Sequence, residues 1–93
     1  MYKRLNDSVL IIDVRDEKEH INSSKKIIKN TLNIPLCNLE KQVKNMCIRK
    51  DRLIILFCSE GKRSKVAYII LKDLGFNNII DASCVSNIEK LIN

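Results

Sequence analysis

The segment LIILFCSEGKRS, residues 53–64, joins an apolar run to a short turn that contains glycine and basic residues. Its first half, Leu53–Cys58, is almost continuously apolar, which favours a strand buried on both faces of a parallel sheet. Apolar residues then recur at helical spacing from Ser64 to Leu74, and Ser64 or an adjacent residue can cap the helix start. Gly61 lets the backbone turn tightly between them. The segment therefore predicts a strand, a turn and a helix in immediate succession.

Further strands and helices surround this unit along the chain. The other predicted strands are Val9–Val14, Leu32–Ile34 and Asn78–Asp81, and the other predicted helices are Asp16–Ile21, Asn38–Met46 and Val85–Ile92. Because strands alternate with helices, right-handed crossovers are expected and the fold class is α/β. The 93 residues contain no repeat, linker or low-complexity tract, so residues 1–93 are predicted to form a single domain.

Composition and charge narrow the classes of partner. Hydrophobic residues make up 45% and charged residues 30%, as in a folded globular protein rather than a disordered tail. The 17 Lys and Arg against 11 Asp and Glu give a net charge of +6, which favours acidic partners or small anions. These basic residues are spread along the chain and aromatic residues are only 4%, so no nucleic-acid partner is expected.

The apolar segments are too short to predict a membrane partner. The N-terminus has no apolar signal core, and no apolar run approaches the ~20 residues of a membrane span. We therefore expect a cytoplasmic protein with reduced thiols. Its cysteines form no C-x-x-C pair and His20 is the single histidine, so we expect neither disulfides nor a bound metal, and no cofactor.

Among the four cysteines, Cys58 is set apart by its context. It ends a buried strand and is followed by a glycine turn and a helix start, whereas the other three lack that context and are expected to be structural. Unpaired N–H groups and the positive end of the dipole at a helix start stabilise an anion, and Lys62 and Arg63 add positive charge. Because the thiolate is the nucleophilic form, the sequence predicts a reactive thiolate at Cys58.

Three segments of the chain resemble motifs of one known family. Cys58–Ser64 resembles the C-x-x-G-x-R-S active-site loop of the rhodanese family of sulfurtransferases. Leu10–Arg15, followed by Glu19, resembles the D-V-R-x-x-x-E signature of that family, and Leu32–Leu36 resembles its I-N-I-P-L strand. The segments follow the family's order, and the resemblance spans about Val9–Leu91. It implies a rhodanese-like α/β fold with a central parallel β-sheet of four to five strands flanked by helices.

The resemblance also implies a sulfurtransferase whose catalytic residue is Cys58. Cys58 would accept a sulfane sulfur as a persulfide from a small anionic donor such as thiosulfate, and pass it to a thiophilic acceptor: a thiol, a cyanide-type molecule or a protein. The implied substrate-binding residues are Ser59, Glu60, Gly61, Lys62, Arg63 and Ser64, held around the outer sulfur mainly through main-chain N–H groups. Lys62 and Arg63 are expected to attract the donor. Since a persulfide is an anion, the charge argument for the helix start supports this function independently.

Asp13 and Arg15 are expected to support the site rather than to catalyse. Asp13 lies at a strand end near the same sheet edge, where it would fix loop amides, and Arg15 would pair with Glu19. His20 stands where the family usually has Phe or Tyr, and is expected to be a partly buried packing residue rather than a general base.

Two alternatives from other classes stay open. Cysteine phosphatases and arsenate reductases related to this fold carry seven residues from Cys to Arg, whereas Cys58 to Arg63 counts six positions (63 − 58 + 1). The shorter loop favours a single sulfur atom over a tetrahedral oxyanion. The other alternative, a catalytically weak rhodanese-like module that binds a partner protein or regulates it, follows from departures in the flanking segments.

Several segments depart from the family pattern. Lys26–Thr31 replaces the usual G-H-I-x-G-A run, a few extra residues lie around Ile21–Lys25, and Ser83–Leu91 replaces a turn that carries a glycine pair. Ser59 stands where Arg is common, and Glu60 would repel an anionic donor. The turn before the last helix commonly abuts the active-site loop, so Cys84 could lie close enough to Cys58 to accept sulfur or form a disulfide. The family's first strand and helix are expected to be shortened to Met1–Ser8.

Overall fold

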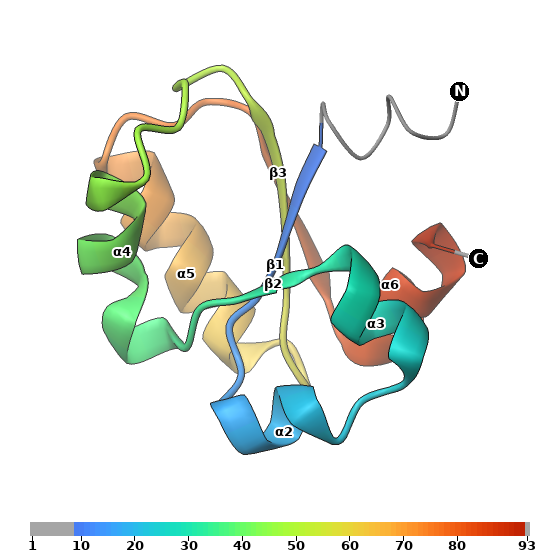
Figure 1. The fold of residues 1–93 in the computed structure, drawn as a ribbon. Coiled ribbons are helices and arrows are strands. Elements are labelled where there is room, and N and C mark those ends of the chain that lie inside the picture. The colour runs from blue at the N-terminus through green and yellow to red at the C-terminus, as the bar shows by residue number, and fades with distance from the viewer. Residues whose placement is uncertain (1–8, 93) are drawn as a thin grey trace.

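Four parallel strands form the sheet at the centre of the structure (Figure 1), a computed structural model that describes residues 9–92. In spatial order they are β2 (Leu32–Asn33), β1 (Val9–Asp13), β3 (Leu53–Phe57) and β4 (Ile79–Ser83). All neighbouring strands run parallel, so their carboxyl ends meet at one edge of the sheet. The predicted α/β fold and parallel sheet are confirmed, with β3 between β1 and β4.

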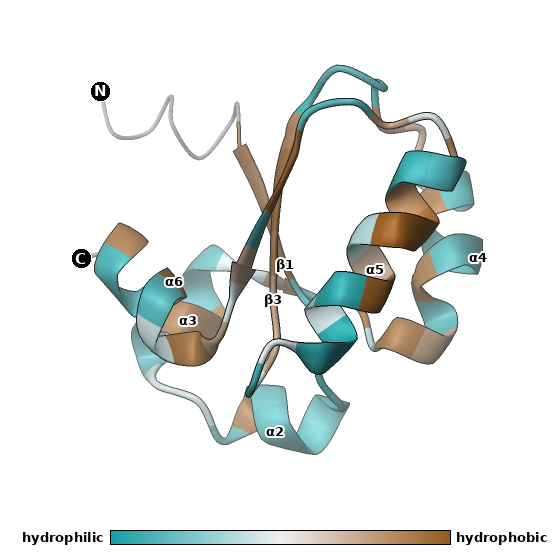
Figure 2. Ribbon diagram, turned by 180° about the vertical axis from the view of Figure 1, so that it is seen from behind, coloured by the Kyte–Doolittle hydropathy of each residue, from teal (hydrophilic) through white to brown (hydrophobic). Residues whose placement is uncertain are grey.

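Helices cover both faces of the sheet and the edge at which its strands finish. They are α2 (Glu17–Ile21), α3 (Lys25–Asn30), α4 (Leu39–Asn45), α5 (Lys62–Asp73) and α6 (Val85–Leu91), with a short 3-10 helix (Leu36–Asn38) before α4. In Figure 1, α4 and α5 lie on one side of the sheet and α3 and α6 on the other, while α2 lies beyond the carboxyl ends of the strands. Figure 2 shows hydrophilic α2 beside the hydrophilic start of α5.

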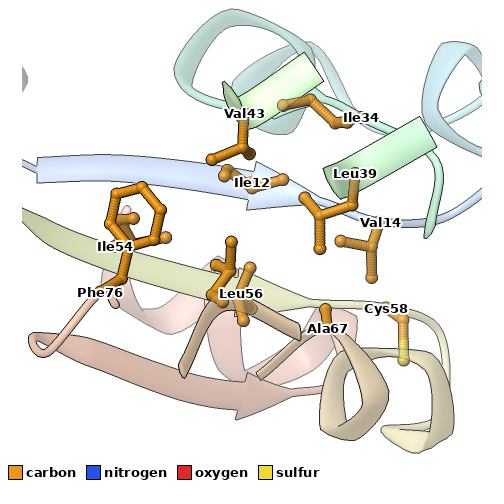
Figure 3. Packing of buried hydrophobic residues seen from close by; sticks show 11 residues of the cluster. Ile12, Val14, Ile34, Leu39, Val43, Ile54, Leu56, Cys58, Ala67 and Phe76 are labelled. Atoms are coloured by element: carbon orange, nitrogen blue, oxygen red, sulfur yellow. The ribbon is translucent and has the colours of Figure 1, made fainter. Parts of the chain in front are cut away.

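The alternation of side chains along β3 explains why its sequence is continuously apolar. Ile54 and Leu56 face α4 and α5, whereas Ile55 and Phe57 face α3 and α6. The first pair packs with Ile12, Leu39, Val43 and Ala67 (Figure 3), and the second packs with Ile27 and Ile88. Each such side chain contributes ~1.5–3 kcal/mol when fully buried. The strand is therefore a firm anchor for the turn that follows it.

The predicted strands and helices are present, with differences at their ends. Helix α5 begins at Lys62, two residues before the predicted Ser64, because Gly61 occupies the N-cap position with a φ of +95°. Strand β4 continues to Ser83 rather than ending at Asp81. The longer strand brings the start of α6 close to the turn after β3.

One helix, α3, is not predicted from the sequence. The Ser24 hydroxyl oxygen accepts a hydrogen bond from the Ile27 N–H at 3.3 Å and so caps the helix. Ile27 is 1% exposed and packs against the sheet. A single buried apolar residue in a short polar segment gives too little periodicity to predict a helix.

The sequence also leads to predictions about the N-terminal segment and about membrane-spanning helices. The shortening of the first strand and helix to Met1–Ser8 lies outside the described residues. Within residues 9–92, none of the helices has the length and apolar character that crossing a bilayer requires.

Candidate active site around Cys58

The turn Cys58–Ser64 begins where β3 ends and leads directly into α5. Cys58 is 1% exposed, and its N–H donates to the Ser83 carbonyl oxygen at 3.0 Å, which ties the turn to the end of β4. Gly61 has a φ of +95°, and a β-carbon there would lie 3.0 Å from Ser83 Oγ. Glycine is therefore required at this position both for the left-handed backbone and for the close approach to β4.

The sulfur of Cys58 accepts two backbone hydrogen bonds. They come from the Gly61 N–H at 3.0 Å and the Ser64 N–H at 3.4 Å. The buried Ser64 hydroxyl donates to the Gly61 carbonyl oxygen at 3.1 Å and fixes the first turn of α5. Burial raises the pKa of the Cys58 thiol, but hydrogen bonds from Ser64 and from the backbone of the turn lower it by more, so the pKa lies below its ordinary value. This geometry favours the thiolate, which is the nucleophilic form.

An ion pair holds the turn against α2. The Arg63 guanidinium donates to both carboxylate oxygens of Glu19, at 2.7 and 3.1 Å, and the Ser59 hydroxyl donates to the same carboxylate at 2.8 Å. The hydrogen bond from Arg63 lowers the pKa of Glu19 to about 2, against a smaller opposing effect of burial and with a further lowering by Ser59. The bidentate geometry fixes the direction of the Arg63 side chain as well as its charge.

A buried polar cluster surrounds Asp13, the last residue of β1. Its carboxylate accepts hydrogen bonds from Arg15 Nε at 2.9 Å, Nη2 at 2.7 Å and the Arg15 backbone N–H at 3.0 Å. His20 Nδ1 lies 3.0 Å from Asp13 Oδ2, and the Arg15 guanidinium also donates to the Ser23 hydroxyl. Asn33 donates to the main-chain oxygens of Asp13 and Arg15. The cluster fixes the backbone that leads from β1 into α2.

These contacts correct one expectation about the supporting residues. Asp13 does fix a loop amide, and His20 is buried against it. The predicted Arg15–Glu19 pair is wrong, because Arg15 pairs with Asp13 and Glu19 pairs with Arg63. The Asp13 carboxylate is fully buried, whereas the Glu19 side chain is 35% exposed. Leaving a fully buried carboxylate without an opposite charge costs more free energy than leaving a partly exposed one, so Arg15 pairs with Asp13 rather than with Glu19.

The other predicted site residues lie along the rim of the turn. Glu60 and Lys62 are exposed and Ser59 is half-buried. Both Lys62 and Arg63 are expected from the sequence to attract an anionic donor. In the structure the charge of Arg63 is paired with Glu19, which leaves Lys62 as the exposed cation of the turn.

The turn between β4 and α6 abuts this loop. Glu60 and Cys84 form an isolated antiparallel backbone bridge, and the Ser83 carbonyl oxygen lies 3.6 Å from the Cys58 sulfur. Ser83 has a φ of +74°, in the region that favours glycine, where the family pattern has a glycine pair. Cys84 is partly exposed, and its hydrogen bond with Ser86 lowers the pKa of its thiol. Sulfur transfer between Cys58 and Cys84 stays a hypothesis.

Within residues 9–92, no three His, Cys, Asp or Glu side chains gather where they could hold a metal ion.

Comparison with known proteins gives the class to which this fold and site belong. The chain matches the family model of the rhodanese-like domain over residues 1–83. It therefore belongs to the rhodanese-like family, as its three motifs indicate.

Individual relatives agree with this assignment in fold. The structure is similar to that of a rhodanese-related protein from Thermoplasma volcanium, with 32% identity, a TM-score of 0.69, and coverage of 96% of this chain and 84% of that one. The human single-domain sulfurtransferase TSTD1 has the same fold at 20% identity and a TM-score of 0.72, with coverage of 96% of this chain and 88% of that one. Among curated proteins, 3-oxoacyl-(acyl-carrier-protein) reductase FabG from Rickettsia conorii is 30% identical over 86 residues. That match covers 90% of this chain, which spans only 35% of the length of the curated relative.

The partner of Glu19 is not among the residues predicted to pair with it. Glu19 is the last position of the D-V-R-x-x-x-E segment, and its partner Arg63 lies 44 positions further along. A usable signal existed, since both motifs follow strands of one parallel sheet and therefore meet at the same edge. The contact of Ser23 with Arg15 has no comparable signal in the sequence.

Proposed function

We propose that this chain is a sulfurtransferase that carries sulfane sulfur as a persulfide on Cys58. The observation that carries the proposal is the pair of hydrogen bonds from the Gly61 and Ser64 N–H groups to the Cys58 sulfur, at 3.0 and 3.4 Å. N–H groups at a helix start stabilise a thiolate before the reaction and an anionic persulfide after it. Membership of the rhodanese-like family supports the same chemistry.

The proposed loading step uses a small anionic donor such as thiosulfate. The Cys58 thiolate attacks the outer sulfur of thiosulfate, a new sulfur–sulfur bond forms, and the donor's own sulfur–sulfur bond breaks. The electron pair of that bond leaves with sulfite, and the persulfide keeps the single negative charge of the thiolate. In the second step a thiol or cyanide removes the outer sulfur and returns Cys58 to the thiolate. No external oxidant or reductant is needed.

The residues of the turn and of the neighbouring loop have different proposed roles. We expect the backbone of Ser59, Glu60, Gly61, Lys62, Arg63 and Ser64 to surround the outer sulfur, as the Gly61 and Ser64 N–H groups already contact the Cys58 sulfur. Lys62 is the exposed positive charge proposed to attract an anionic donor. Arg63 acts as a positioning residue through Glu19. Asp13 and Arg15 hold the neighbouring loop. We take residues 1–93 as one domain, working where thiols stay reduced, as in the cytoplasm.

Thiosulfate loading followed by cyanide tests the proposal. The protein is incubated with thiosulfate, its intact mass is measured, and thiocyanate is quantified after cyanide is added. We expect a one-sulfur adduct and thiocyanate from the wild type, neither from Cys58→Ser, and both from Cys84→Ser. An absence of both products from the wild type would contradict the sulfurtransferase and favour a partner-binding module. Hydrolysis of an aryl phosphate with neither sulfur product would indicate a phosphatase instead.

A further inference from the structure

A polar pocket of about 480 Å³ lies between the α2–α3 turn and α6. Glu19, Asn22 and Ser23 line it from the α2–α3 side, and Val85 and Glu89 line it from α6. This volume falls within the range of small-molecule sites.

The pocket borders the turn that carries Cys58. Glu19 in one wall accepts the hydrogen bond from the Ser59 hydroxyl at 2.8 Å. Val85 in the other wall directly follows Cys84, whose backbone pairs with Glu60. The pocket therefore lies one residue away from the Ser59–Glu60 side of the turn, and no residue of Cys58–Ser64 lines it directly.

Most charged groups in the pocket walls already have partners. The Arg15 guanidinium is held by Asp13 at 2.7 and 2.9 Å, and Glu19 is held by Arg63 at 2.7 Å. By contrast, the side chains of Glu89 and Asn22 make no hydrogen bond or ion pair with any residue from 9 to 92. Glu89 is thus the charged group of the pocket that is available to a ligand.

These free groups define the chemistry of an occupant. The Glu89 carboxylate and the Asn22 amide oxygen both accept hydrogen bonds, so they suit a protonated primary amine. Val85, which is half-buried, supplies apolar surface for a short alkyl chain. An anion would meet the Glu89 carboxylate, which has no partner among residues 9–92, and a guanidinium whose charge is already compensated, so the pocket disfavours anionic molecules.

We propose that this pocket binds the amine end of a small aminothiol, whose thiol is the sulfur acceptor. The inference rests on the proposed persulfide function. The thiol of the acceptor loses its proton to solvent, and the resulting thiolate attacks the outer sulfur of the Cys58 persulfide. The bond between the outer sulfur and Cys58 Sγ breaks, its electron pair remains on Cys58 as thiolate, and the acceptor leaves as a persulfide. The anionic donor would then meet Lys62 of the turn, whereas the cationic acceptor would meet Glu89 of α6.

Acceptor kinetics with a charge-removing variant test the proposal. Protein loaded with thiosulfate is reacted with cysteamine, which carries an amine, and with 2-mercaptoethanol, which does not. We expect Glu89→Gln to raise the KM for cysteamine about threefold to fivefold, the effect of one solvent-accessible ion pair, and to leave the KM for 2-mercaptoethanol unchanged. Using the ratio of variant to wild type for each thiol removes the difference in their intrinsic reactivity.

A matched control is Glu17→Gln, which removes the same charge from α2 outside the pocket. We expect it to change neither KM. Equal effects of Glu89→Gln and Glu17→Gln on cysteamine, or equal effects of Glu89→Gln on the two thiols, would overturn the proposal.

A binding measurement separates this proposal from the proposed function. Unloaded wild-type protein is titrated with propylamine, which has no thiol, and backbone amide shifts are followed by NMR. We expect shifts concentrated at residues 22–24 and 85–89 in the wild type and their loss in Glu89→Gln. If these shifts occur but thiosulfate forms no persulfide on Cys58, the amine site is supported and the sulfurtransferase is contradicted. Persulfide turnover without the shifts would overturn the amine site alone.

Discussion

Gly61 is required both by its left-handed backbone and by its close approach to Ser83. Its φ is +95°, and a β-carbon would lie 3.0 Å from Ser83 Oγ. We expect Gly61→Ala to cost about 1–2 kcal/mol in the free energy of unfolding, from the left-handed backbone alone. Because the N–H groups of Gly61 and Ser64 would be displaced from the sulfur, loading of Cys58 should also slow by at least about tenfold.

Gly75 provides the control for that variant. It has a φ of +99°, but its β-carbon would only reach Lys50 at 3.8 Å, an ordinary contact. Gly75→Ala should lose a similar free energy of unfolding in urea and load Cys58 at the wild-type rate. Slow loading in both variants would mean that general destabilisation, not the shape of the turn, limits the reaction.

Ser83 has a side chain at a position where the backbone conformation favours glycine. Its φ is +74°, and it contacts Gly61 from the end of β4. We expect Ser83→Gly to raise the free energy of unfolding by about 0.5–1 kcal/mol, since relief of the left-handed strain exceeds the entropy cost of glycine. Urea denaturation measures the change. Ser83→Ala keeps the strain and should give no such gain; an equal gain would place the cost in the hydroxyl group instead.

At the scale of elements, Glu19 joins α2 to the start of α5. Its pKa is lowered from 4.5 to about 2 by the hydrogen bond from Arg63. A lowered folded-state pKa means that the ion pair contributes fully above pH 4.5 and is lost as the pH falls through about 2. Because the side chains are a third exposed, we expect Glu19→Gln to cost only about 1 kcal/mol at pH 7.

The test is to measure how the loss of unfolding free energy in Glu19→Gln depends on pH. The difference in unfolding free energy between wild type and Glu19→Gln should shrink between pH 4.5 and pH 2, as followed by urea denaturation. Glu17→Gln, which removes a carboxylate of the same helix outside this ion pair, corrects for the general effect of charge. A difference that stays constant over this range would mean that the carboxylate charge is not what holds the two helices.

The same elements show how far the sequence determines the site. The apolar run of β3 and the helical spacing of α5 are strong local signals, and both elements are where they are predicted. The start of α5 is misplaced because a capping serine is the commoner signal, whereas here a left-handed glycine begins the helix. Glu19 is assigned the wrong partner because Arg15 is near in sequence, while Arg63 is brought close only by the folded sheet. Local structure is predictable, and the parallel sheet places both motifs at one edge, but the sequence does not say whether Arg15 or Arg63 pairs with Glu19.

At the scale of the whole molecule, the net charge of +6 should speed the approach of the proposed anionic donor. Charged ligands are attracted over distances comparable with the Debye length, about 10 Å at 0.1 M salt. We expect the second-order rate of thiosulfate loading to fall as salt is added. Lys62→Gln should lower the rate about twofold to threefold at low salt, since Lys62 is the exposed cation of the turn.

Lys72→Gln separates local from overall charge. Lys72 lies in the last turn of the same helix, at the opposite end from Lys62. Because each variant removes one lysine, the two variants have the same net charge. It should load at close to the wild-type rate. Equal slowing in the two variants would show that only the overall charge matters.

The hydrogen bond from the Cys58 N–H to the Ser83 carbonyl makes Cys58, the proposed nucleophile, a member of the sheet's hydrogen-bonded ladder. Loops commonly fray at little cost, but this one can open at Cys58 only by unpairing the ends of β3 and β4. The backbone at Cys58 is therefore stabilised by the cooperativity of the whole fold. Its backbone amide is expected to exchange with deuterated solvent on the slow timescale of the β3 amides, and the sulfur is held ready for reaction without a closing motion.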